Sequence, residues 1–158
     1  KRCRLALANY PISGTPHHPL GAHHKENIQK LFLFDTGILN HMLGTSYRQI
    51  KQQNYAYKGY VAENFAQQEL VALGFDPTFS WHDARAEIEF LIQAEDGEIV
   101  PIEVKSGKRT RARSLDSYRT KCRPLKTLKL TGTQGSPASE KTDIVIPLYF
   151  VHHLLSKL

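Results

Sequence analysis

An α/β fold is predicted by the order of three kinds of pattern in this sequence of 158 residues. Residues 57–73 have helical periodicity, three short β-like stretches follow at 78–82, 87–93 and 99–105, and a second helix and a strand come next. Hydrophobic residues make up 41% of the chain and charged residues 23%, which excludes a disordered or fibrous protein. The predicted core is therefore helix, three-stranded meander, helix and strand, followed by a C-terminal helix.

Residues 1–50 are predicted to be an N-terminal segment, a remnant or linker from a larger chain, and residues 51–158 the domain itself. The chain begins at Lys1 without an initiator methionine, which is the basis of that expectation. Within this segment, a strand is expected to end at Pro11, because proline cannot donate to a ladder. A buried strand is expected at 30–34, followed by a turn into a short helix.

The helix expected at 57–73 has apolar residues on two opposite sides of the helical wheel, which predicts neighbours on both. Glu63 and Gln67 lie one turn apart on a narrow polar stripe between them. This stripe is either an exposed surface or part of a site. Gly74 follows as the expected C-terminal cap.

Charged side chains alternate along the predicted meander. Glu87 and Glu89 are expected on one face of their strand, opposite the apolar side chains between and after them, and Glu103 and Lys105 share a face of theirs. An Asp-Gly turn at 96–97 pairs the two strands and brings the four groups together. Burying them without a partner is costly, so the pattern predicts a bound cation or phosphate. The alternatives are outward residues of an edge strand and a structural ion pair.

Four further elements are expected in the C-terminal part of the chain. Ser114 is expected to cap a helix that runs to Cys122, and 125–130 reads as a strand. Residues 132–143 are expected to form a mobile loop. A short strand at 144–146 and a helix starting at Pro147 complete the chain.

Charge is distributed unevenly along the sequence. Residues 51–100 hold 9 acidic and 3 basic groups, whereas residues 101–130 hold 10 basic and 2 acidic groups. The acidic block suggests cation binding and the basic block phosphate binding. The alternative is a solvated surface on which the two signs mix in space.

Membrane, secretory and disulfide-rich classes receive no support. No apolar run approaches the roughly 20 residues that span a bilayer, and no signal-peptide core is present. Two cysteines, Cys3 and Cys122, make no disulfide framework, so a cytoplasmic location is expected. His17, His18, His23 and His24 suggest zinc, but without spaced acidic or cysteine partners a mobile loop is the preferred interpretation.

The charged residues follow a pattern: an acidic residue, a hairpin and then Glu-x-Lys on a strand, with a further Glu on the preceding helix. This pattern resembles that of the PD-(D/E)xK (restriction-endonuclease-like) nuclease superfamily. The chain is also similar to a domain found at the C-terminus of many prokaryotic AAA+ ATPases, over nearly all of residues 28–158. Five motifs in order carry this second resemblance: KLFLFDTGIL at 30–39, KGYVAEN at 58–64, EIEF at 87–90, PIEVKSG at 101–107 and IPLY at 146–149.

The resemblance implies a restriction-endonuclease-like core and a metal-dependent site. Glu89 takes the place of the motif aspartate, Glu103 and Lys105 are the Glu-x-Lys pair, and Glu63 matches the helix carboxylate. Glu63, Glu89 and Glu103 would hold Mg²⁺ or Mn²⁺, and Lys105 would steer water or offset charge at the phosphate. Because Glu89 stands where the family usually has Asp, either the strand shifts, or Glu87 shares the metal, or the site is inert.

Basic residues follow the Glu-x-Lys strand directly, where a nucleic-acid backbone would lie beside such a site. They are Lys108, Arg109, Arg111, Arg113, Arg119 and Arg123. The alternative is a helix that packs on an acidic ATPase surface. The expected function is a Mg²⁺-dependent nuclease acting on DNA, with an ATPase module on the same parent chain, since no phosphate-binding loop occurs here. The rival hypothesis is a nuclease-fold module without chemistry that binds DNA or a protein partner.

Overall fold

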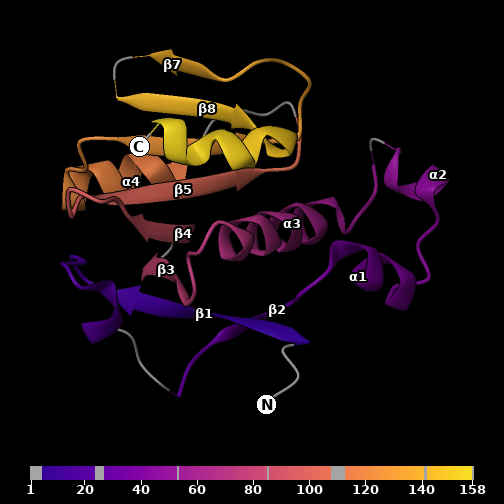
Figure 1. The fold of residues 1–158 in the computed structure, drawn as a ribbon, viewed down its shortest axis with the longest axis horizontal. Coiled ribbons are helices and arrows are strands. Elements are labelled where there is room, and N and C mark those ends of the chain that lie inside the picture. Colours follow the sequence, from indigo (N-terminus) through magenta and orange to yellow (C-terminus); the bar gives the residue numbers. More distant parts are fainter. Residues whose placement is uncertain are drawn as a thin grey trace.

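One mixed sheet of eight strands, in the order β2-β1-β3-β4-β5-β6-β8-β7, carries the fold of the computed structural model (Figure 1). The structure describes residues 5–23, 27–52, 54–84, 86–107, 113–140 and 142–157. The strands are β1 (Ala6–Ser13), β2 (Lys30–Leu33), β3 (Thr78–Asp83), β4 (Ala86–Gln93), β5 (Ile99–Lys105), β6 (Thr127–Thr131), β7 (Ala138–Glu140) and β8 (Asp143–Pro147).

Helices cover both faces of this sheet. They are α1 (Thr36–Met42), α2 (Tyr47–Ile50), α3 (Lys58–Ala72), α4 (Arg113–Cys122) and the 3₁₀ helices η1 (Leu20–Ala22) and η2 (Leu148–Lys157). Helices α3 and η2 pack on one face around Ala66, Leu70 and Val151, and α4 packs on the other through Leu115 and Tyr118. The sheet therefore separates two apolar cores.

The predicted α/β order of helix, meander, helix and strand is confirmed as α3-β3-β4-β5-α4-β6. Helix α3 ends as expected: Gly74 has a φ of +98°, its N–H donates to the Val71 carbonyl, and the Phe75 N–H donates to Leu70. Strands β4 and β5 pair antiparallel across the Asp-Gly turn, where Gly97 has a φ of +85°. Strand β6 then returns parallel to β5.

The N-terminal segment is part of the same sheet, so the predicted boundary at residue 50 does not divide the fold. Strand β1 lies between β2 and β3, antiparallel to β2 and parallel to β3. It continues through Pro11 to Ser13 instead of ending there. Its pairing with β2 stops at Asn9, so the far side of β1 at Pro11 has no ladder that a missing N–H would interrupt.

Several local expectations differ from the structure. In β2 only Phe32 is buried, and Leu31 is 61% exposed because β2 is an edge strand. The described part of α4 runs from Arg113, so Ser114 lies inside the helix and does not cap it. The expected loop at 132–143 contains β7, and the expected C-terminal helix is a 3₁₀ helix.

Helix α3 packs against α1 and η2 as well as against the sheet, as expected for a helix with neighbours on both sides, but its N-terminal end is open to solvent. Tyr57 and Tyr60 are 50% and 65% exposed, whereas Ala62, Ala66 and Leu70 on the other side are buried. The α1 region beside it also exposes apolar side chains. Across the described residues, no helix combines the length and the apolar character that crossing a membrane requires.

Candidate active site at the fork of β4 and β5

Strands β4 and β5 part at the place where the candidate carboxylates lie. Their ladder runs from Gln93 opposite Ile99 to Phe90 opposite Ile102 and goes no further. Beyond it the Val104 N–H donates to Oε2 of Glu89 at 3.1 Å, so a side chain takes the place of a backbone acceptor. The two strands thus form a fork that is closed by the Glu89 carboxylate.

A β-bulge creates this fork. Phe79 pairs with Leu91 but Trp81 pairs with Ile88, so β4 has one extra residue, and Glu89 lies within this stretch. As a result Ile88 packs in the α4-side core and Phe90 in the α3-side core, so the expectation that they share a face was wrong.

Glu103 is the most deeply buried carboxylate of the fork. Its side chain is 1% exposed, and Oε1 forms an ion pair with Nζ of Lys105, which is 30% exposed. Oε2 is buried and has no hydrogen-bond partner within the described residues. A buried carboxylate oxygen without a hydrogen bond is costly, so a further cation or hydrogen-bond donor is expected beside it.

Burial raises the pKa of Glu89 to about 8, and the nearby Glu103 carboxylate adds to this effect. Burial also raises the pKa of Glu103, although its bond to Lys105 opposes the shift. Burial alone would lower the pKa of Lys105, but the hydrogen bond and charge of Glu103 outweigh it and raise the value overall. Lys105 is the ion-pair partner of Glu103, and the charges of Lys129 and Lys30 also interact with Glu103 and Glu89, respectively.

Glu63 faces the same region from α3. The polar stripe of α3 that holds Glu63 and Gln67 faces the sheet. The Gln67 side chain is fully buried and accepts a hydrogen bond from the Thr78 hydroxyl at 2.7 Å. Asn64 pairs with both backbone groups of Leu33, at 2.8 and 3.0 Å. These bonds fix the rotation of α3 and place Glu63 beside the sheet edge.

Lys30 is the site residue that the sequence reasoning missed. Its Nζ lies 2.6 Å from Oε2 of Glu63 and 3.6 Å from Oε1 of Glu87, which is also 3.7 Å from His82 Nε2. Burial lowers the pKa of Lys30, but its bond to Glu63 and the neighbouring carboxylates raise it overall. Strand alternation could have found it, because Lys30 shares a face with buried Phe32.

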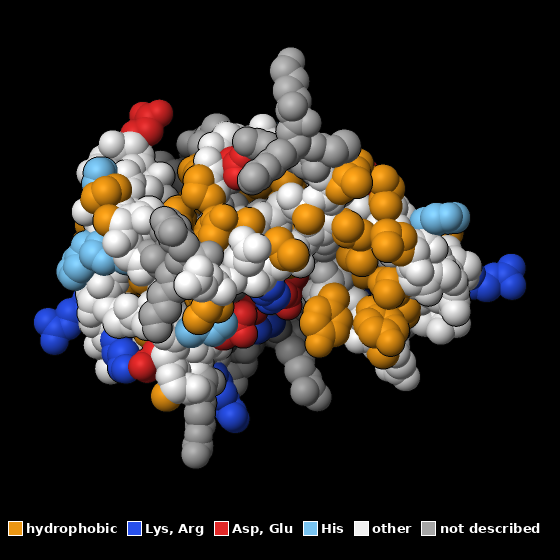
Figure 2. Space-filling view, turned by 90° about the horizontal axis from the view of Figure 1, so that it is seen from below, with side chains coloured by type: hydrophobic (Ala, Val, Ile, Leu, Met, Phe, Trp, Pro, Cys, Tyr) orange, Lys and Arg blue, Asp and Glu red, His pale blue; other side chains and the backbone are white. Residues whose placement is uncertain are grey.

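Glu63, Glu87, Glu89 and Glu103 thus gather with Lys30 and Lys105. Figure 2 shows acidic and basic side chains side by side near the middle of one face of the molecule. Among the side chains that the structure describes, no three His, Cys, Asp or Glu residues are grouped closely enough to hold a metal ion. Of the histidine cluster, His17 and His23 have ring centroids 5.8 Å apart, and His24 lies outside the described residues.

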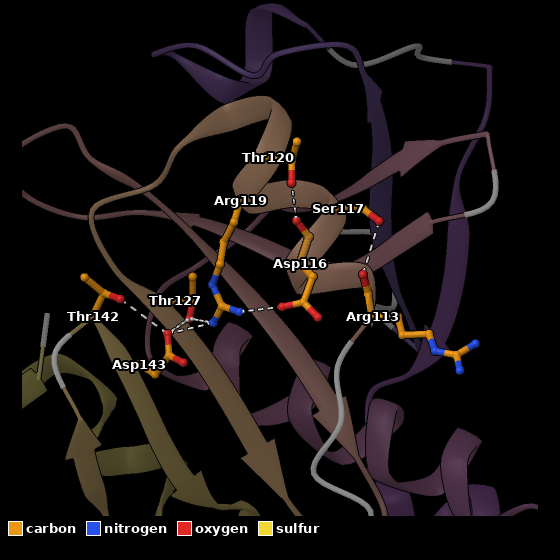
Figure 3. A network of polar contacts seen from close by, with 8 residues as sticks. All are labelled: Arg113, Asp116, Ser117, Arg119, Thr120, Thr127, Thr142 and Asp143. Carbon is orange, nitrogen blue, oxygen red and sulfur yellow. Dashed lines mark hydrogen bonds and ion pairs between the residues drawn. The ribbon is translucent and has the colours of Figure 1, made fainter.

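The six basic residues fall into three groups: those outside the described residues, two exposed arginines near the ends of α4, and Arg119. Lys108, Arg109 and Arg111 lie outside the described residues. Arg113 is exposed, and Figure 3 shows its guanidinium pointing away from the polar network of α4. Arg123 is exposed just beyond α4, with a φ of +47°.

Arg119 occupies a structural position instead. Its guanidinium bonds Asp116 at 2.9 Å, Asp143 at 2.6 Å and Thr127 at 2.9 Å (Figure 3). Asp143 also accepts from Thr127 at 2.9 Å. Arg119 therefore links α4 to β6 and β8, and its donors are directed into the fold.

Stability is expected to fall as the pH rises from about 5 to about 8. The folded state keeps a proton on Glu89 up to a pKa of about 8, whereas the unfolded chain loses it near 4.5, so deprotonation favours unfolding in this interval. Glu89→Gln should flatten the dependence of melting temperature on pH and stabilise the protein at pH 8. Glu69→Gln, on the same α3 helix that carries Glu63, serves as the control of equal charge change. A wild-type profile that rises between pH 5 and 8 would contradict the assignment.

Comparison with known proteins gives one match. A family model described as a domain of unknown function (DUF4143) matches residues 58–151, from the start of α3 into η2. No curated protein and no solved structure matches the chain. The matched region contains Glu63, Glu87, Glu89, Glu103 and Lys105, whereas Lys30 lies outside it.

Proposed function

The chain belongs to the DUF4143 family, a domain of unknown function, and from its own geometry we propose that it is a metal-dependent nuclease domain of the PD-(D/E)xK type. The observation that carries this proposal is the fork of β4 and β5, with buried Glu103 beside Lys105 and an unpartnered Glu103 oxygen. The element order α3-β3-β4-β5-α4-β6 and the position of Glu63 on α3 are consistent with it.

The donor set fits a hard divalent cation. Glu89 and Glu103 are carboxylates in a partly dehydrated fork, and Mg²⁺ and Mn²⁺ prefer such oxygen ligands. The buried Oε2 of Glu103 has no hydrogen-bond partner among the described residues, and burial raises the pKa of both carboxylates. When bound, the ion supplies a water of lowered pKa and neutralises charge on the phosphate.

The chain's own residues would perform the remaining tasks. Glu89 would hold the ion as a carboxylate, with its proton lost to solvent and one oxygen kept by the Val104 N–H, which fixes its orientation. Glu103 anchors Lys105, whose raised pKa keeps its ammonium charged beside the phosphate. Glu63 supplies a third carboxylate after release from Lys30. The substrate proposed is DNA, and an ATPase module on the same parent chain is the proposed partner.

Metal should stabilise the folded domain and permit cleavage. Saturating Mg²⁺ or Mn²⁺, at about 100 times Kd, is expected to add about 2.7 kcal/mol, or roughly 5–10 °C in melting temperature. The same ions should support cutting of supercoiled, linear or branched DNA, and EDTA should stop it. Glu103→Gln should lose both effects, whereas Glu69→Gln should keep them. Absence of a metal-dependent shift and of cleavage on all three substrates would refute the proposal.

A second candidate is a nuclease-fold module that binds DNA or a protein partner without chemistry. It is favoured by the bond from Lys30 to Glu63, which occupies the helix carboxylate at 2.6 Å, and by the absence of a three-carboxylate group among the described residues. This candidate requires salt-sensitive DNA binding that survives Glu103→Ala, with no cleavage by the wild type. Lack of DNA binding at low salt would leave only protein docking.

A further inference from the structure

A cavity of about 360 Å³ opens between α3, η2 and the ends of β5 and β6. This volume lies in the range of small-ligand pockets. Its wall is mostly apolar and aromatic, with Tyr55, Val61, Phe65 and Tyr149 among the lining residues. The described residues of the candidate active site do not line it, so it is a separate feature of the same end of the sheet.

Residues that line the cavity are next to residues of the fork and of α3 in the chain. Ser106, which lines it, directly follows Lys105, and Ala62, which also lines it, directly precedes Glu63. The Gly132 N–H donates to the Lys105 carbonyl at 2.7 Å. A Cβ on Gly132 would lie 2.5 Å from the Ser106 carbonyl oxygen, so only glycine permits this approach. A ligand in the cavity would therefore lie next to the strand end that presents Lys105.

The two tyrosines of the wall are held at their hydroxyl groups. Tyr149 donates to the Gly135 carbonyl at 2.7 Å and accepts from its N–H at 2.9 Å. The Tyr55 hydroxyl lies 2.8 Å from Oγ1 of Thr45. These bonds limit movement of both rings and reduce the conformational entropy that binding would cost.

Polar and cationic groups supplement the apolar wall. Thr133 and Gln134 bring a hydroxyl and an amide, which suit the edge of a heterocycle, and Lys58 brings a positive charge. An apolar and aromatic surface with a few hydrogen-bonding groups and one lysine matches the chemistry of an unstacked nucleobase and its phosphate.

We propose that this cavity receives one unstacked base of a single-stranded nucleic acid whose adjacent phosphate lies toward Lys105 and Lys58. The inference rests on the proposed function, because the fork supplies the phosphate site. It adds a preference for single-stranded or flipped-out substrate over intact duplex. A free nucleotide shares the base chemistry, and the experiment separates the two sources.

The test measures binding in EDTA, without cleavage, to fluorescein-labelled single-stranded DNA, duplex DNA, an all-abasic strand of equal length, and mononucleotides as competitors. Wild-type protein should bind the strand with bases about 5- to 150-fold more tightly than the abasic strand. Val61→Trp, which fills the cavity, should abolish this difference and leave weak, salt-sensitive binding. Tyr60→Trp places the same side chain one residue earlier, at a 65% exposed position outside the cavity, and should bind like wild type.

Tyr149→Leu and Tyr149→Phe provide a second test that does not depend on Val61→Trp folding. The leucine variant should lose the base-dependent part of binding, and the phenylalanine variant, which keeps the ring, should retain it. Equal affinity for normal and abasic strands, or full binding by both Val61→Trp and Tyr149→Leu, overturns the inference. Tight binding of mononucleotides with no gain from a strand also overturns it in favour of a free-nucleotide pocket.

Failure of this inference is distinguishable from failure of the proposed function. Base-dependent binding without metal-dependent cleavage removes the nuclease proposal and leaves the base pocket. Cleavage that is unaffected by Val61→Trp and Tyr149→Leu removes the base pocket and leaves the nuclease.

Discussion

Lys105→Ala is expected to lower the rate of metal-dependent DNA cleavage by at least about 100-fold, the usual cost of removing a group that stabilises developing charge. The Lys105 ammonium forms an ion pair with Glu103 and is 30% exposed. The measurement is the single-turnover cleavage rate at saturating Mg²⁺.

Two variants separate this effect from loss of charge or loss of fold. Lys121→Ala removes the same charge from a lysine that pairs with Asp83 on the α4 side, and should cleave at the wild-type rate. Lys105→Met keeps the aliphatic part of the side chain and should fold, as judged by its melting curve, while remaining inactive. If a folded Lys105→Met protein cleaved at the wild-type rate, the role given to Lys105 would be wrong.

Trp81→Ala is expected to reduce the free energy of unfolding by about 3–5 kcal/mol, the cost of deleting a large buried aromatic side chain. Trp81 is fully buried in β3, and its ring meets Tyr118 of α4 edge to face with centroids 5.0 Å apart. Its Nε1 donates to the Gly14 carbonyl at 2.7 Å. The substitution therefore removes packing against α4 and a tie to the N-terminal strand together.

Urea unfolding monitored by circular dichroism measures this effect. Trp81→Phe, which keeps a ring but not the N–H, should cost less than alanine. Tyr60→Ala removes an aromatic ring at a 65% exposed position and should change stability by no more than about 0.5 kcal/mol. A loss below about 1 kcal/mol for Trp81→Ala would show that residues 1–50 and α4 are not joined through this contact.

The local elements could be predicted because their causes lie in adjacent residues. Gly74 permits the positive φ that ends α3, and Gly97 permits the hairpin turn. Alternation along β5 places Ile102 and Val104 in the α3-side core and pairs Glu103 with Lys105. The gathering of Glu103 with Lys105 on one strand followed from this alternation alone.

What could not be predicted depends on pairing between distant segments. Lys30 reaches Glu63 only because β1 pairs with β3, 69 residues apart at Asn9 and Thr78. The residues near Glu89 in the sequence do not predict a bulge, because the bulge arises from the register in which β4 pairs with β3. Helical spacing placed Arg119 correctly on its helix, but its partner Asp143 comes from β8, and this bond directs the arginine inward.

The position of β1 between β2 and β3 has a consequence for how the chain folds as it is synthesised. Strands β1 and β2 leave the ribosome before β3 and can pair with each other, but the second edge of β1 has no partner until Thr78–Asp83 emerges. Until then the apolar side chain of Ile12, fully buried in the finished fold, has no core to enter. Folding of the N-terminal hairpin is therefore completed by the arrival of the central sheet, and a nascent chain stalled before β3 would expose an open strand edge to aggregation.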